Sequence, residues 1–109
     1  MTVDDVRSCF LGALKRVALY GFHPHGSGNT SAGYSLTSAL DYHYLTQEPP
    51  YGTWTLCVGY LESLLGVEDL WYWQETQGSE SRVLAALSHG AERAEEIFEM
   101  HVHRGRVTE

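Results

Sequence analysis

Two histidine pairs are the residues of this chain whose type and spacing suggest chemistry. His23 and His25 flank a proline in the stretch GFHPHGSGNTSAG, residues 21–33, and His101 and His103 form a second His-x-His pair. An extended His-x-His loop can present two imidazoles to one divalent metal, and a second pair would complete four ligands for zinc or another divalent ion. This pattern predicts a His-dependent metal-binding protein or a metal-dependent hydrolase.

Two observations weaken the metal hypothesis. Residues i and i+2 of a helix point about 200° apart, so His101 and His103 chelate one ion only if the helix ends before them. Asp41, two residues before His43, is the one carboxylate whose spacing suits a supporting hydrogen bond. Solvent-exposed histidines in a loop and a tail are the simpler interpretation, and they predict a protein without a cofactor.

The sequence also lacks a complete motif for phosphate binding or nucleophilic catalysis. A P-loop requires GxxxxGK[ST], and no lysine follows the GSGN segment. Cys9 and Cys57 lie on apolar faces, where a thiol is inert, and no GxSxG elbow occurs. These observations favour a role other than catalysis.

Charge and hydropathy limit the classes of partner. The chain has 109 residues, with 14 acidic and 7 basic side chains and a net charge of −7. Nucleic-acid binding requires clustered Lys and Arg, so an acidic chain without a basic run argues against it. No stretch approaches the length of a membrane span, and the amino terminus lacks the layout of a signal peptide. We therefore expect no membrane contact and a cytoplasmic location.

Hydrophobic periodicity predicts an all-α fold, a single domain of about four helices over residues 1–109. The first helix is expected at residues 3–20, where apolar residues recur every three or four positions. Thr2 and Asp5 have the spacing of a capping box at its start, and Gly21 suits its end.

Three further elements are expected after the long Gly/Ser-rich loop of residues 21–33. YSLTSALDYHYL has one apolar side, and the two prolines that follow it form a break. TWTLCVGYLESLLG fits a helix through Leu65, although its first eight residues also suit a strand. The longest helix is capped by Ser79 and continues without a break through Gly90, where a small residue lets another helix approach closely. Residues 102–109 are expected to fray.

An aromatic cluster lies in VEDLWYWQETQG, which is expected to form a short helical turn and a loop. Consecutive aromatic residues cannot all face one core, so at least one of them should be exposed, and exposed Trp and Tyr are common anchors of protein interfaces. Alternatively, the two tryptophans cover the ends of the helices. The predicted partner-binding residues are the three aromatic residues and an acidic rim: Trp71, Tyr72, Trp73, Glu68, Asp69 and Glu75.

Two segments resemble the DUF6197 family of small proteins from actinobacteria and their phages. CFLGALKRVA, residues 9–18, is similar to the family's Cys-x-x-Gly-Ala-Leu segment. WQETQGSESRVLAALSHGAERAEE, residues 73–96, resembles its Trp-Asn-Asp, loop and Val-rich final helix, with Gln74 and Glu75 in place of Asn and Asp. The resemblance implies a fold and an origin, and it implies no activity.

The sequence therefore predicts a small acidic helical module for protein–protein interaction, either phage-encoded or an actinobacterial accessory protein. It would bind a host protein or a second copy of itself through the aromatic cluster. One alternative is the metal-binding protein or hydrolase that the two histidine pairs suggest, and another is a purely structural subunit of a larger assembly.

Overall fold

The computed structural model describes residues 2–24, 27–29, 33–40 and 51–107, with the backbone alone for residues 27–29, 51 and 104–107. The elements in chain order are α1 (Val3–Tyr20), β1 (Ser27–Asn29), β2 (Gly33–Tyr34), a helical turn at residues 36–40, α3 (Tyr51–Leu65), α4 (Leu70–Thr76), α5 (Glu80–Glu92) and α6 (Ala94–Val107). The predicted all-α class is confirmed. Among the described helices, none combines the length and the apolar character required to span a bilayer.

Helix α1 has the boundaries that its end signals predict. The Thr2 hydroxyl accepts the backbone N–H of Asp5 at 3.2 Å, and the Asp5 carboxylate accepts that of Thr2 at 2.8 Å. This reciprocal capping box pairs two backbone donors that the first turn of a helix leaves free. At the other end Gly21 has φ +88° and donates its N–H to the carbonyl of Val17 at 2.9 Å.

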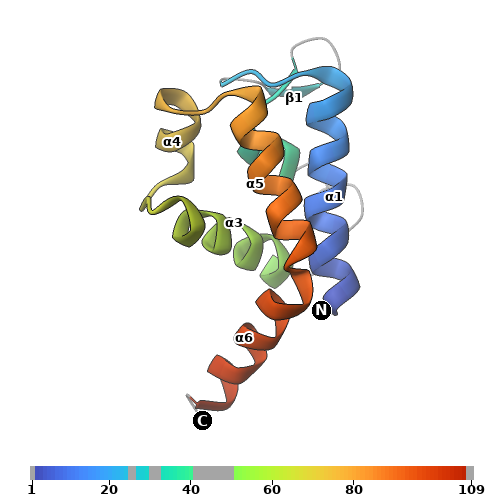
Figure 1. Ribbon diagram of the computed structural model, residues 1–109, viewed down its shortest axis with the longest axis vertical. Coiled ribbons are helices and arrows are strands. Elements are labelled where there is room, and N and C mark those ends of the chain that lie inside the picture. Colours follow the sequence, from blue (N-terminus) through green and yellow to red (C-terminus); the bar gives the residue numbers. More distant parts are fainter. Residues whose placement is uncertain (1, 25–26, 30–32, 41–50, 108–109) are drawn as a thin grey trace.

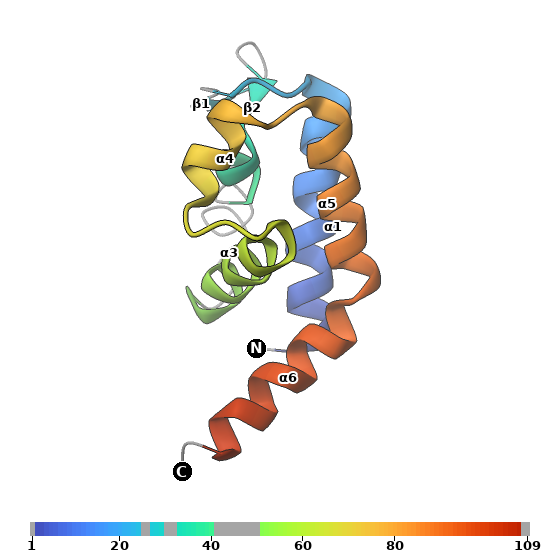
Figure 2. The same cartoon turned by 60° about the vertical axis from the view of Figure 1, so that its left-hand side comes forward.

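Helices α1 and α5 lie side by side and antiparallel at the centre of the molecule (Figure 1, Figure 2). The ring of Phe10 lies directly over Gly90, because a Cβ built on Gly90 would be 2.5 Å from its Cε1 atom and 2.6 Å from its Cδ1 atom. No side chain larger than hydrogen fits at position 90 while the two helices keep this spacing. The close approach predicted at Gly90 is therefore confirmed.

Helix α3 runs crosswise against this pair and completes the main core (Figure 2). It buries Cys57, Val58 and Leu61. The helical interpretation of TWTLCVGYLESLLG is confirmed and the strand alternative is wrong. The helix begins at Tyr51, directly after the two prolines, and it ends at Leu65 as predicted.

A buried polar contact joins α4 to the helical turn at residues 36–40. The Gln74 side-chain oxygen accepts the backbone N–H of Thr37 at 3.0 Å, and the Gln74 amide nitrogen donates to the Thr37 hydroxyl at 3.1 Å. Both residues are buried, so these bonds satisfy polar groups that water does not reach. This contact fixes the face that α4 turns toward the core.

The expected uninterrupted final helix is wrong, because the chain bends at Arg93 between α5 and α6. Arg93 has φ −102° and ψ 12°, and its N–H is shared between the carbonyls of His89 and Gly90. The bend directs α6 away from the rest of the molecule, while Ala94 and Ile97 remain buried (Figure 1). The hydrophobic period continues through the bend, which is why periodicity alone does not reveal it.

Two further segments bear on the sequence predictions, namely the last helix and the connector that follows α1. Helix α6 runs to Val107, and the fraying expected over residues 102–109 stays a prediction. Within the expected loop of residues 21–33, β1 pairs with β2, and Tyr34 exchanges backbone hydrogen bonds with Gly21 and His23 at 3.1 and 3.0 Å. Part of the segment that its composition predicts to be an irregular loop is therefore a short pair of strands.

Replacing Gly90 with Ala should destabilise the protein. Overpacking against the fully buried Phe10 ring costs about 1–3 kcal/mol, and the better helix propensity of Ala returns only about 1 kcal/mol. Gly59, in the interior of α3, is the matched control because a Cβ there meets nothing within 4 Å. Urea unfolding should show a loss of about 1 kcal/mol for Gly90→Ala and a gain of about 0.5–1 kcal/mol for Gly59→Ala. Equal effects of the two substitutions would contradict the packing of Phe10 on Gly90.

Candidate functional site

Helix α4 separates the aromatic cluster into an inner and an outer group. Leu70, Trp73 and Gln74 follow helical spacing and face the core, where Trp73 is only 5% exposed. Trp71 and Tyr72 lie on the outer side and are 44% and 64% exposed. We call these two outer residues the α4 aromatic patch. Of the three predicted aromatic anchors, the structure leaves two at the surface and places Trp73 in the core.

Hydrogen bonds from two carboxylates hold the first turn of α4. The Asp69 Oδ1 atom accepts the backbone N–H of Trp71 at 2.9 Å and that of Tyr72 at 3.4 Å, which makes Asp69 the N-cap. The Glu62 carboxylate, from α3, accepts the N–H of Leu70 at 3.1 Å. Asp69 therefore caps the backbone that carries the α4 aromatic patch, and Glu62 links the same backbone to α3.

The Trp71 side chain is also fixed by a neighbouring aromatic ring. Its indole meets that of Trp54 edge to face, with ring centroids 6.2 Å apart and an interplanar angle of 65°. Trp54 is half-buried and packs against the core. Because the contact with Trp54 already restricts the Trp71 side chain, Trp71 loses less side-chain entropy when a partner covers it.

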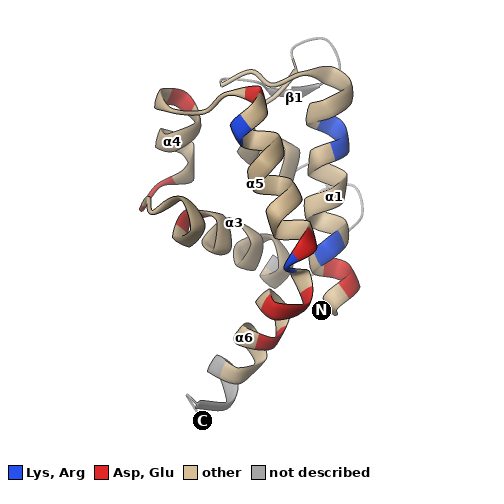
Figure 3. Cartoon of the chain, in the orientation of Figure 1, with Lys and Arg blue, Asp and Glu red and all other residues tan. Residues whose placement is uncertain are grey.

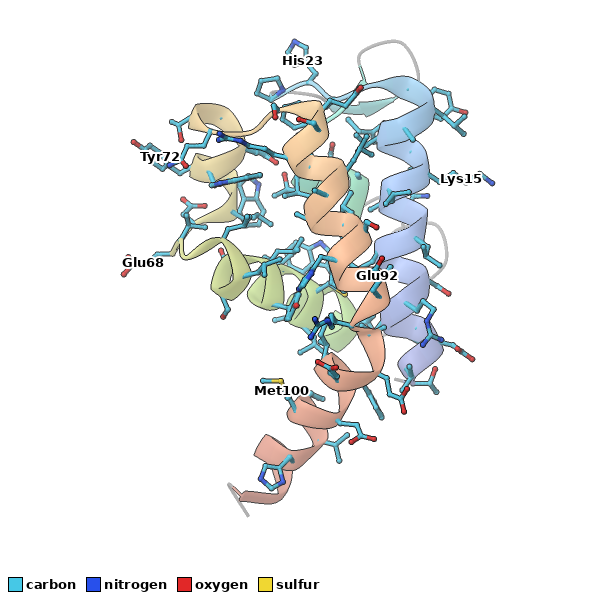
Figure 4. The ribbon with its side chains drawn as sticks, viewed as in Figure 1. Lys15, His23, Glu68, Tyr72, Glu92 and Met100 are labelled. Atoms are coloured by element: carbon cyan, nitrogen blue, oxygen red, sulfur yellow. The ribbon has the colours of Figure 1, made fainter. Side chains whose placement is uncertain are left out.

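Acidic side chains border the α4 aromatic patch. Glu68, Asp69 and Glu75 are all exposed, and acidic residues occur both before and within α4 (Figure 3). Figure 4 shows Glu68 and Tyr72 directed outward on the same side of the molecule. The three predicted rim residues are therefore exposed directly before and within the helix that carries the exposed aromatic residues, and Asp69 is also its cap.

The structure does not bring the predicted metal ligands together. His23 lies beside β1 and β2 at one end of the long axis, whereas His101 and His103 lie on α6 at the other end (Figure 1, Figure 4). His101 and His103 belong to one continuous helix, so they point in different directions. His25, together with the Asp41 and His43 pair, lies outside the described residues. Within the described part of the chain, no three His, Cys, Asp or Glu side chains form a group that could hold a metal.

The two cysteines contact each other inside the core. Cys9 of α1 and Cys57 of α3 are free thiols without solvent exposure. A hydrogen bond with Cys9, together with burial, raises the pKa of the Cys57 thiol far above its ordinary range. Because the thiolate is the nucleophilic form, the Cys57 thiol is suited to packing and not to nucleophilic attack.

Two hollows in the surface were not predicted from the sequence. The larger, about 570 Å³, is a groove between α3 and α6 that is lined by residues such as Leu56, Tyr60, Ile97 and the exposed Met100. Burial raises the pKa of the Tyr60 hydroxyl, with a smaller opposing effect of Arg93. The bend at Arg93 creates this groove, so a periodicity analysis that treats the final helix as straight misses it.

The second hollow, which we call the α5 pocket, lies among α3, α4 and α5 and has a volume of about 410 Å³. Arg82 and His89 line one wall of it. Arg82 and His89 are seven residues apart, which is two helical turns, and this spacing alone predicts that they share one face of a helix. The residues opposite them come from distant segments and give no such signal.

Comparisons of the chain with protein-family models, with curated proteins and with solved structures find no match.

The raised pKa of Cys57 should make the protein less stable at alkaline pH. Above pH 9.0, the ordinary pKa of the thiol, the unfolded chain loses the Cys57 proton while the folded chain retains it. The free energy of unfolding should then fall by about 1.4 kcal/mol per pH unit from this group alone. Urea unfolding at several pH values between about 8 and 10.5 measures this slope.

Cys57→Ala is the control, because it removes the thiol and leaves the contribution of Tyr60 in place. The slope above pH 9.0 should decrease by about 1.4 kcal/mol per pH unit in this variant. Identical slopes in the two proteins would show that the Cys57 thiol titrates in the folded state as it does in the unfolded chain.

Proposed function

We propose that this chain is a small acidic helical module for protein–protein interaction and that it binds its partner through the α4 aromatic patch. The observation that carries the proposal is the exposure of two adjacent large aromatic side chains, Trp71 at 44% and Tyr72 at 64%, on a helix whose other face is buried. Trp and Tyr are the residue types most often responsible for binding energy at protein interfaces.

The support beneath the α4 aromatic patch favours this function over an accidental exposure. The Asp69 cap, the hydrogen bond from Leu70 to Glu62 and the contact between Trp71 and Trp54 hold the patch before a partner arrives. A preorganised surface loses little conformational entropy on binding, so more of the contact energy appears as affinity.

The acidic rim defines the chemistry of the partner. A chain with a net charge of −7, and with Glu68, Asp69 and Glu75 around its aromatic residues, suits a protein with an apolar depression bordered by Lys and Arg. Such a pair associates faster at low ionic strength, because opposite charges steer the encounter.

The biological setting is also part of the proposal. The resemblance to the DUF6197 family supports an actinobacterial or phage origin, in which the module acts in the cytoplasm on a host protein or on a second copy of itself. The acidic charge argues against direct binding to nucleic acid.

Removing the two aromatic side chains should abolish partner capture. We expect wild-type protein immobilised as bait to retain at least one protein from an actinobacterial lysate. The Trp71→Ala, Tyr72→Ala double variant should retain about tenfold less of that protein, or still less. Quantitative mass spectrometry of the retained proteins, at low and at high salt, measures both the loss and the electrostatic contribution.

Leu19→Ala is the matched control, because Leu19 on α1 is 64% exposed, as Tyr72 is. This variant should retain the same proteins as the wild type. If the double variant and the wild type retained the same set, or if neither retained any protein, the α4 aromatic patch would not be the binding surface.

A further inference from the structure

The α5 pocket has the size and lining of a small-molecule site. Its volume of about 410 Å³ falls within the usual range for ligand pockets. Leu64 and Leu65 at the end of α3, together with Trp73 of α4, provide apolar surface. Arg82 and His89 of α5 provide nitrogen donors on the facing wall. One side of the pocket is therefore apolar and the other carries basic side chains.

The basic wall is unusual for so acidic a chain. The protein has 14 acidic and 7 basic side chains, and Arg82 is the only Lys or Arg within α5. Arg7 and Arg93 are paired with Asp4 and Glu96 at 3.2 Å in each case. Arg82 makes no ion pair with a carboxylate of the described residues, so its charge is available to a ligand.

Both basic side chains are held in place without a ligand. The Nη1 atom of Arg82 donates a hydrogen bond to the backbone carbonyl of Gln77 at 3.1 Å, which anchors one edge of the guanidinium. The His89 ring stacks on that of Tyr60, with centroids 6.2 Å apart and an interplanar angle of 13°. The Arg82 side chain is exposed, and its guanidinium retains further N–H donors whose planar arrangement suits a carboxylate.

We propose that the α5 pocket binds a small planar organic anion, specifically an aromatic carboxylate. The carboxylate accepts hydrogen bonds from the Arg82 guanidinium, and the aromatic body extends along the pocket against Leu64, Leu65, the accessible edge of Trp73 and the His89 ring, which lies two helical turns from Arg82. This site is independent of the α4 aromatic patch, because Trp71 and Tyr72 do not line it.

The test uses 2-naphthoate as the probe and neutral 2-naphthamide as its isostere. We expect 2-naphthoate to shift the amide NMR signals of residues 82–89 and the Trp73 indole signal, and to bind at least about tenfold more tightly than the amide. Arg82→Gln should weaken the binding of 2-naphthoate by about tenfold or more. Arg82→Lys keeps the charge but loses the planar guanidinium, so it should weaken binding by less. His89→Gln should weaken it severalfold.

Matched controls separate this site from general effects of charge and from the proposed interaction surface. Arg93→Gln removes an exposed positive charge from outside the pocket, and the Trp71→Ala, Tyr72→Ala double variant removes the α4 aromatic patch. Both should bind 2-naphthoate as the wild type does. The proposal is overturned if 2-naphthoate and 2-naphthamide bind equally, if Arg82→Gln binds like the wild type, or if no signal shifts at about 1 mM probe.

Discussion

The close approach of α1 and α5 is the constraint on which the rest of the structure depends. The Phe10 ring occupies the space that any side chain at position 90 would need, so these helices meet at a spacing that only glycine permits. Helix α3 packs across the pair and brings Glu62 to the first turn of α4. The places of the α4 aromatic patch and of the α5 pocket therefore follow from the spacing of one helix pair.

Features that depend on neighbouring residues were predictable from the sequence. The capping box of Thr2 and Asp5, the end of α1 at Gly21 and the Ser79 cap of α5 each involve residues within a few positions of one another. The all-α class follows from hydrophobic spacing for the same reason. Gly90 was predictable as a point of close approach, although its contact with Phe10 was not.

Features that join distant segments were not predictable. The bend at Arg93 breaks no hydrophobic period, and the pairing of β1 with β2 depends on backbone contacts that composition does not encode. At the candidate site, the sequence identified the aromatic cluster and its acidic rim. It did not separate the exposed Trp71 from the buried Trp73, because that depends on which face of α4 the contact between Gln74 and Thr37 turns inward.

The contact between Gln74 and Thr37 also links the motions of two segments that are 37 residues apart. Separating them would leave the Thr37 amide buried without a partner, so α4 and residues 36–40 should open together as one cooperative unit. We expect the amide protons of both segments to share one opening free energy. A partner that immobilises α4 would then slow hydrogen exchange at residues 36–40 without touching them.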